Sequence, residues 1–136
     1  TYKSIDKLEL TNSFETSTRE LTRKLNNNYR YVISFGQKPA INEALIELIA
    51  NKKSNILKTN FQYKKLEKFF HNNEINFSLS KNAGNYLCNN IYYEGLNYIK
   101  QNKISAKMIF IHIPNIEESY DFDKLASVIS KFIDSI

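Results

Sequence analysis

Residues 75–114 read INFSLSKNAGNYLCNNIYYEGLNYIKQNKISAKMIFIHIP, and this stretch decides the fold class. It begins with a short apolar run, Ile75–Leu79, which is typical of a strand. Apolar residues then recur at helical spacing over Tyr86–Asn102. A second apolar run, Ala106–Ile113, ends at Pro114 and is typical of a buried strand. The stretch therefore predicts a strand, a helix and a second strand in succession.

Short apolar runs and amphipathic segments also alternate through the rest of the chain. The spacing over Ile41–Ala50 fits a strand and a helix equally well. Such alternation predicts an α/β fold with a mostly parallel sheet that is covered by helices. The other predicted elements are a strand at Ile5–Leu10, a buried strand at Tyr31–Phe35, and helices from a cap at Asn12 or Ser13 through Asn26, over Phe61–Phe70, and from Asp121 onward.

The length of 136 residues predicts one domain, over residues 1–136. A single cysteine excludes a disulfide within this sequence and is typical of a reducing compartment, so we expect a cytoplasmic protein. Thr1–Leu10 is polar and charged, unlike a signal peptide, and no apolar run reaches the ~20 residues of a membrane span. We therefore expect no membrane partner.

The net charge of +5 raises the question of an acidic partner such as a nucleic acid. The 19 basic residues are scattered among 14 acidic ones, and the densest basic groups are the pairs Lys52-Lys53 and Lys64-Lys65. Scattered charge of both signs is typical of a solvated surface. We therefore expect no nucleic-acid partner, and a basic binding module without catalysis is kept as an alternative function.

Cys88 lies between the predicted strand at Ile75–Leu79 and the long predicted helix. The thiol should therefore lie near the first turn of that helix, where the helix dipole favours an anion. A thiolate is the nucleophilic form of cysteine, so this is a suitable position for a catalytic nucleophile. The alternative is that Cys88 is simply a small buried apolar side chain, which is the commoner role of a lone cysteine.

Two histidines are available as partners for this thiol. His71 follows a predicted helix and is expected to be exposed. His112 ends a buried strand and lies 24 residues after Cys88, one helix and one strand later along the chain. In a strand–helix–strand unit these two positions can meet at the same edge of the sheet. His112 is therefore the better candidate for a catalytic base, although a histidine at a strand end is often only a hydrogen-bonded core residue.

Two motifs around these residues resemble those of pyroglutamyl peptidase type I, also called the pyrrolidone-carboxylate peptidase family. Residues 80–89 follow the family's pattern S-x-x-A-G-x-Y/F-x-C-N, and residues 110–114 follow its pattern F-I-H-x-P. The family consists of cysteine peptidases with a doubly wound α/β fold. The resemblance thus implies a mostly parallel sheet with helices on both faces, of the phosphorylase/hydrolase-like type.

The resemblance also implies a catalytic triad. The family uses Cys, His and Glu, which carry over to Cys88, His112 and Glu47, because residues 46–51 resemble the family's stretch around its Glu. This likeness favours a strand at residues 41–49 for the segment whose periodicity is ambiguous. Without the resemblance, Glu47 would be interpreted as a surface acid on an edge strand.

Two further residues match substrate-binding positions of the family. Gln37 resembles its strand-end Gln, and Tyr86 occupies its aromatic position beside the substrate ring. Alternatively, Gln37 closes a turn and Tyr86 packs the helix. The implied activity is hydrolysis of the amide bond after an N-terminal pyroglutamyl residue, with a blocked peptide as partner, no cofactor and no metal. Members of the family often associate, so a homo-oligomer is also compatible with the resemblance.

The chain departs from the family pattern in three places. It starts after the family's first strand and its glycine-rich, Phe-containing loop, which helps to line the pocket. It lacks a loop with a Pro-Asp-Asn motif, since only a short polar link is predicted between Asn51 and the helix at Phe61. Leu48 stands where the family usually has Arg. These differences leave open a divergent or inactive relative with altered amide specificity.

Overall fold

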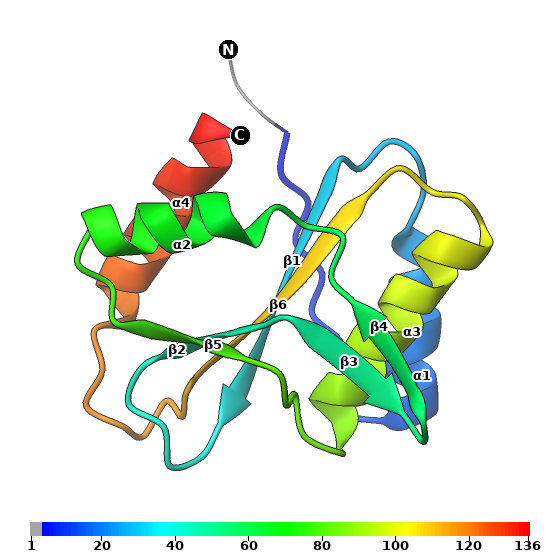
Figure 1. The fold of residues 1–136 in the computed structure, drawn as a ribbon, viewed down its shortest axis with the longest axis horizontal. Coiled ribbons are helices and arrows are strands. Elements are labelled where there is room, and N and C mark those ends of the chain that lie inside the picture. The colour runs from blue at the N-terminus through cyan, green and yellow to red at the C-terminus, as the bar shows by residue number, and fades with distance from the viewer. Residues whose placement is uncertain (1–3) are drawn as a thin grey trace.

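Strand β6 (Lys107–Pro114) forms the centre of the structure because both of its faces are apolar. The structure, a computed structural model, describes residues 4–136 (Figure 1). The four residues from Met108 to Ile111 are at most 1% exposed, so β6 is a buried strand as predicted. The domain predicted over residues 1–136 includes residues 1–3, which lie outside the part that the structure describes.

The main sheet has four strands in the order β1-β6-β2-β5. Strand β1 is Tyr31–Lys38, β2 is Ala44–Glu47 and β5 is Phe77–Ser80. The pairs β1–β6 and β2–β5 are parallel, whereas β2 runs antiparallel to β6. The prediction of a mostly parallel sheet is confirmed.

Helices cover both faces of this sheet (Figure 1). Helices α1 (Phe14–Lys24) and α3 (Leu87–Gln101) lie on one face. Helices α2 (Tyr63–Asn72) and α4 (Phe122–Ser135) lie on the other. Each face has its own apolar cluster: Leu21, Tyr92, Leu96, Met108 and Phe110 belong to the first, and Ile46, Phe70, Ile109, Ile111 and Phe132 to the second. The predicted α/β class with helices on both faces is therefore confirmed.

The single strand predicted at 41–49 is wrong in its extent. Strand β2 ends at Glu47, Leu48 interrupts the pairing, and a separate strand β3 (Ile49–Lys52) follows. Strand β3 pairs antiparallel with β4 (Asn55–Lys58) in a two-stranded sheet. The short polar link predicted in this region is thus also wrong, because β4 packs Leu57 against the first apolar cluster.

Two other strand predictions need correction. Residues 5–10 form no strand, because they are mostly exposed and pair with no strand among the described residues. The strand predicted as buried at Tyr31–Phe35 is an edge strand, and the side chains of those two residues are 38% and 44% exposed. An edge strand buries only part of each face, which apolar composition alone does not reveal.

The final helix begins where its capping residue predicts. Asp121 Oδ1 accepts a hydrogen bond of 2.9 Å from the backbone N–H of Lys124. Ser13 occupies the corresponding position before α1 but makes no side-chain capping bond. Of the helices formed by residues 4–136, none is long and apolar enough to cross a membrane.

Replacing Asp121 with Ala should lower the free energy of unfolding by about 1 kcal/mol, because the first turn of α4 loses its capping acceptor. Urea unfolding followed by circular dichroism measures this change. Asp134→Ala is the matched control, since Asp134 lies in the last turn of the same helix, where an acid is not favoured by the dipole. An equal loss in both variants would contradict the capping argument.

Candidate active site

The register of β2 against β6 brings Glu47 and His112 together. Glu47 pairs with Phe110, and Leu45 pairs with His112, so Glu47 and His112 are diagonal neighbours on one face of the sheet. Glu47 Oε2 lies 2.6 Å from His112 Nδ1. Both side chains are buried, with 0% and 3% of Glu47 and His112 exposed. Glu47 is therefore an interior residue and not a surface acid.

The carboxylate of Glu47 has an unusual environment. One oxygen accepts the hydrogen bond from His112, while Oε1 is buried without a hydrogen-bond partner among the described residues. A buried carboxylate whose charge is balanced by one neighbour depends strongly on that neighbour. Glu47 and His112 therefore form a tightly coupled pair.

Cys88 lies above the same face of the sheet, in the first turn of α3. It is the only cysteine of the chain and is half-buried. Gly36 pairs with His112 in the parallel register, and a Cβ atom built on Gly36 would lie 2.5 Å from Cys88 Sγ. The missing side chain of Gly36 thus provides the space that the thiol occupies beside His112.

The environment of His112 favours its charged form. Burial by itself lowers the pKa of the imidazole, but hydrogen bonding to Cys88 and to Glu47 outweighs it and raises the pKa of His112 to about 9 from 6.5. The imidazolium lies between a thiol and a carboxylate. This arrangement can stabilise a thiolate on Cys88 and can donate a proton to a leaving group.

The start of α3 adds a second favourable element for an anion. Tyr86 is the N-cap residue, and it makes no side-chain capping bond to the first turn. The amides at the beginning of a helix point outward and carry the positive end of the dipole. Cys88 therefore lies in a helix turn whose dipole favours an anion.

The other two predicted site residues have different partners. Gln37 follows Gly36 in β1, so its side chain leaves from the opposite face of the sheet. Its Oε1 accepts a 3.0 Å hydrogen bond from the backbone N–H of Ile116. Tyr86 is 69% exposed, and its ring meets that of Phe14 edge to face at 5.2 Å. The structure thus brings together Cys88, His112 and Glu47, whereas these two residues make their contacts elsewhere.

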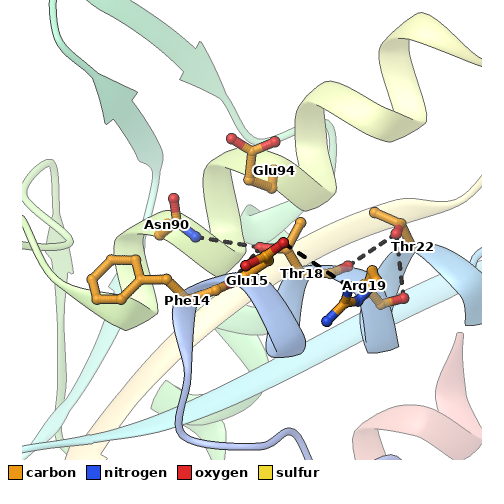
Figure 2. Close-up of a pocket in the computed structure, with 7 residues that line it drawn as sticks. All are labelled: Phe14, Glu15, Thr18, Arg19, Thr22, Asn90 and Glu94. Carbon is orange, nitrogen blue, oxygen red and sulfur yellow. Dashed lines mark hydrogen bonds and ion pairs between the residues drawn. The ribbon is translucent and has the colours of Figure 1, made fainter.

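A surface groove lies between α1 and α3, apart from these three residues. Asn90 Nδ2, on α3, donates a 3.3 Å hydrogen bond to Thr18 Oγ1 of α1, which Figure 2 marks with a dashed line. The side chains lining this groove are Phe14, Glu15, Thr18, Arg19, Thr22, Asn90 and Glu94. Within residues 4–136, no group of three or more His, Cys, Asp or Glu side chains is arranged to hold a metal ion.

Sequence reasoning missed the role of Gly36. The sequence places Gly36 at a predicted strand end, whereas β1 continues through it to Lys38. A glycine inside a strand often marks a close approach by another group. That signal, combined with the nearby cysteine-bearing helix, was the available indication of the Gly36–Cys88 contact.

Gly36→Ala should destabilise the protein by about 1–3 kcal/mol, because the new methyl group overlaps the Cys88 sulfur and the Phe110 ring. Urea unfolding measures the loss. In a double-mutant cycle, Cys88→Ala should recover part of it by removing one of the two clashes. Strict additivity of the two substitutions would show that Gly36 and Cys88 do not interact.

His112 should titrate near pH 9 in the folded protein. Because this value is raised above 6.5, the stability that it contributes is complete below pH 6.5 and is lost as the pH rises through about 9. Imidazole proton NMR can follow the titration, since the chain has two histidines and His71→Gln assigns the other signal. Glu47→Gln and Cys88→Ala should each lower the midpoint, and unchanged midpoints would disprove the coupling.

Comparison with known proteins identifies relatives of this chain. A family model for pyroglutamyl peptidase matches residues 47–134. The pyrrolidone-carboxylate peptidase of Brachyspira hyodysenteriae is 34% identical over 77 residues, covering 57% of this chain and 38% of that protein. Pyrrolidone-carboxylate peptidase 1 of Caldanaerobacter subterraneus is 51% identical over 41 residues, covering 30% of this chain and 20% of that protein. The matches therefore span well under two thirds of the length of these relatives.

Solved structures share the fold over most of the chain. Pyrrolidone carboxyl peptidase from Pyrococcus furiosus superposes with a TM-score of 0.82 and 19% identity, covering 93% of this chain and 78% of that one. The enzyme from Thermococcus litoralis gives a TM-score of 0.79 and 20% identity, covering 92% and 74%. The family match includes Glu47, Cys88 and His112 and extends over more than half of the chain. The chain therefore belongs to the pyroglutamyl peptidase family.

Proposed function

We propose that the chain hydrolyses the amide bond after an N-terminal pyroglutamyl residue with Cys88 as nucleophile. The observation that carries this proposal is the placement of the half-buried thiol over Gly36 and beside His112, whose Nδ1 is 2.6 Å from Glu47 Oε2. A nucleophile, a base and a group that orients the base are the three parts of a hydrolytic triad. Membership of a peptidase family supports the same assignment.

In the first step, the Cys88 thiolate attacks the amide carbonyl carbon and forms a C–S bond. The carbonyl oxygen becomes an oxyanion, and the free amides of the first turn of α3 are its donors; each such donor is typically worth ~3 kcal/mol. The imidazolium of His112 gives its proton to the leaving nitrogen as the C–N bond breaks. Glu47 orients the ring and stabilises its charge.

In the second step, the neutral His112 takes a proton from a water molecule that attacks the thioester. The C–S bond breaks, and the pyroglutamyl group leaves as the free acid. The regenerated thiolate regains the imidazolium as its partner. His112 thus acts as acid and then as base, which its contact with both Cys88 and Glu47 permits.

Gln37 and Tyr86 are proposed to bind the pyrrolidone ring. The ring of Tyr86 is 69% exposed and lies next to the helix turn that carries Cys88, where it can stack on the substrate ring. For Gln37 the proposal rests on the family resemblance alone, since its side chain leaves β1 on the face opposite to Gly36 and its Oε1 accepts from Ile116. The names of the relatives, pyrrolidone-carboxylate peptidases, favour this substrate class.

The setting of the reaction follows from the same chemistry. A catalytic thiol must remain reduced, so we propose a reducing compartment such as the cytoplasm. The partner is a peptide whose N-terminus is blocked by the pyroglutamyl ring. Self-association into a homo-oligomer is proposed on the family resemblance alone.

The test is release of a fluorophore from a pyroglutamyl amide. Wild type should release it, and Cys88→Ala should abolish release because no other thiol is present. Asn90→Ala is the control, since Asn90 lies two residues further on and bonds to Thr18 on α1. A prolyl amide, which lacks the ring carbonyl, tests specificity.

Two outcomes would overturn the proposal. Release that persists in Cys88→Ala would assign the activity to another protein in the preparation. Absence of release by a wild-type protein that still reacts with iodoacetamide would leave a reactive thiol without pyroglutamyl activity.

A further inference from the structure

Asn89, the residue after Cys88, makes two hydrogen bonds to the backbone of one residue in β3. Its Nδ2 donates to the carbonyl oxygen of Asn51 at 2.7 Å, and its Oδ1 accepts from the N–H of Asn51 at 3.0 Å. The side chain is 7% exposed. Its amide therefore pairs with Asn51 much as a neighbouring strand would, and it joins the first turn of α3 to β3.

Tyr92 makes a comparable bond at the other end of the same segment. Its hydroxyl donates to the backbone carbonyl of Glu47 at 2.8 Å, and the side chain is fully buried. Burial also raises the pKa of Tyr92, so that the hydroxyl keeps its proton. The bond holds the backbone of the residue whose carboxylate contacts His112.

Asn89 and Tyr92 are three residues apart and share one face of α3. Together they attach the start of this helix to both ends of the segment Glu47–Asn51. The Tyr92 ring also packs on the Phe110 ring, with 5.7 Å between the ring centroids. The Phe110 ring packs on the His112 ring, with 5.1 Å between the centroids. The face of α3 that carries Tyr92 thus contacts both the backbone of Glu47 and the Phe110 ring that packs on His112.

We propose that Asn89 and Tyr92 are positioning residues that set the distance from the Cys88 thiol to the His112–Glu47 pair. The inference rests on the proposed function, in which these three side chains react together. Neither residue touches the substrate. Each acts through the backbone of the segment that carries Glu47.

Tyr92→Phe is the most selective test because it removes a hydroxyl and keeps the ring. Tyr93→Phe is the matched control, since Tyr93 is the next residue, is 8% exposed and has its ring near Lys52 Nζ. On a pyroglutamyl amide, Tyr92→Phe should lower kcat roughly 10- to 100-fold, as for a displacement of up to ~1 Å, with little change in KM. Tyr93→Phe should retain the wild-type value.

Two further measurements require no turnover. In Tyr92→Phe the NMR midpoint of His112 should fall, because a displaced Glu47 interacts more weakly with the imidazole. The pH dependence of the rate at which iodoacetamide alkylates Cys88 should change together with the His112 midpoint. Asn89→Ala should change the same profile, whereas Asn90→Ala should not.

The outcomes separate this inference from the proposed function. A folded Tyr92→Phe protein with the wild-type His112 midpoint and alkylation profile would overturn the positioning role. The positioning role would also be overturned if Tyr93→Phe changed the His112 midpoint and the alkylation profile as much as Tyr92→Phe does. If wild type does not cleave the pyroglutamyl amide, the proposed function fails, and the alkylation and NMR data still decide the role of Tyr92.

Discussion

The contact between His112 and Glu47 is the constraint on which the site depends. A carboxylate with no exposed surface, and with one oxygen that has no partner in the part of the chain that the structure describes, is costly in an apolar interior unless a cation faces it. His112 is that cation, and its own charge is maintained by Glu47 on one side and the Cys88 thiol on the other. The same interaction therefore makes the buried acid tolerable and prepares the imidazole for proton transfer.

The register of β2 against β6 places these two side chains next to each other. Here β2 runs against β6, so Glu47 reaches His112 diagonally across the sheet. After Leu48, whose N–H still donates to the carbonyl of Ser80, the chain continues into the β3–β4 hairpin, to which Asn89 attaches the cysteine-bearing helix. The segment after Glu47 thus links the strand that carries Glu47 to the hairpin that binds the start of α3.

Much of this arrangement could be predicted from the sequence. The motif around Cys88 and the buried strand ending near His112 correctly predicted the α/β class and the α3–β6 succession, since both depend on strong local apolar patterns. The division of residues 41–49 was missed because short apolar segments look alike in either sheet. The contact of Gly36 with the thiol was missed because it joins residues far apart in the chain.

The lone cysteine has a chemical consequence beyond the nucleophilic role proposed for it. A half-buried thiol next to an imidazolium is the kind of group that peroxide converts to a sulfenic acid. Residues 1–136 contain no second cysteine with which that product could condense. Within residues 1–136, reduction of that product would therefore depend on a thiol that reaches Cys88 from outside this stretch.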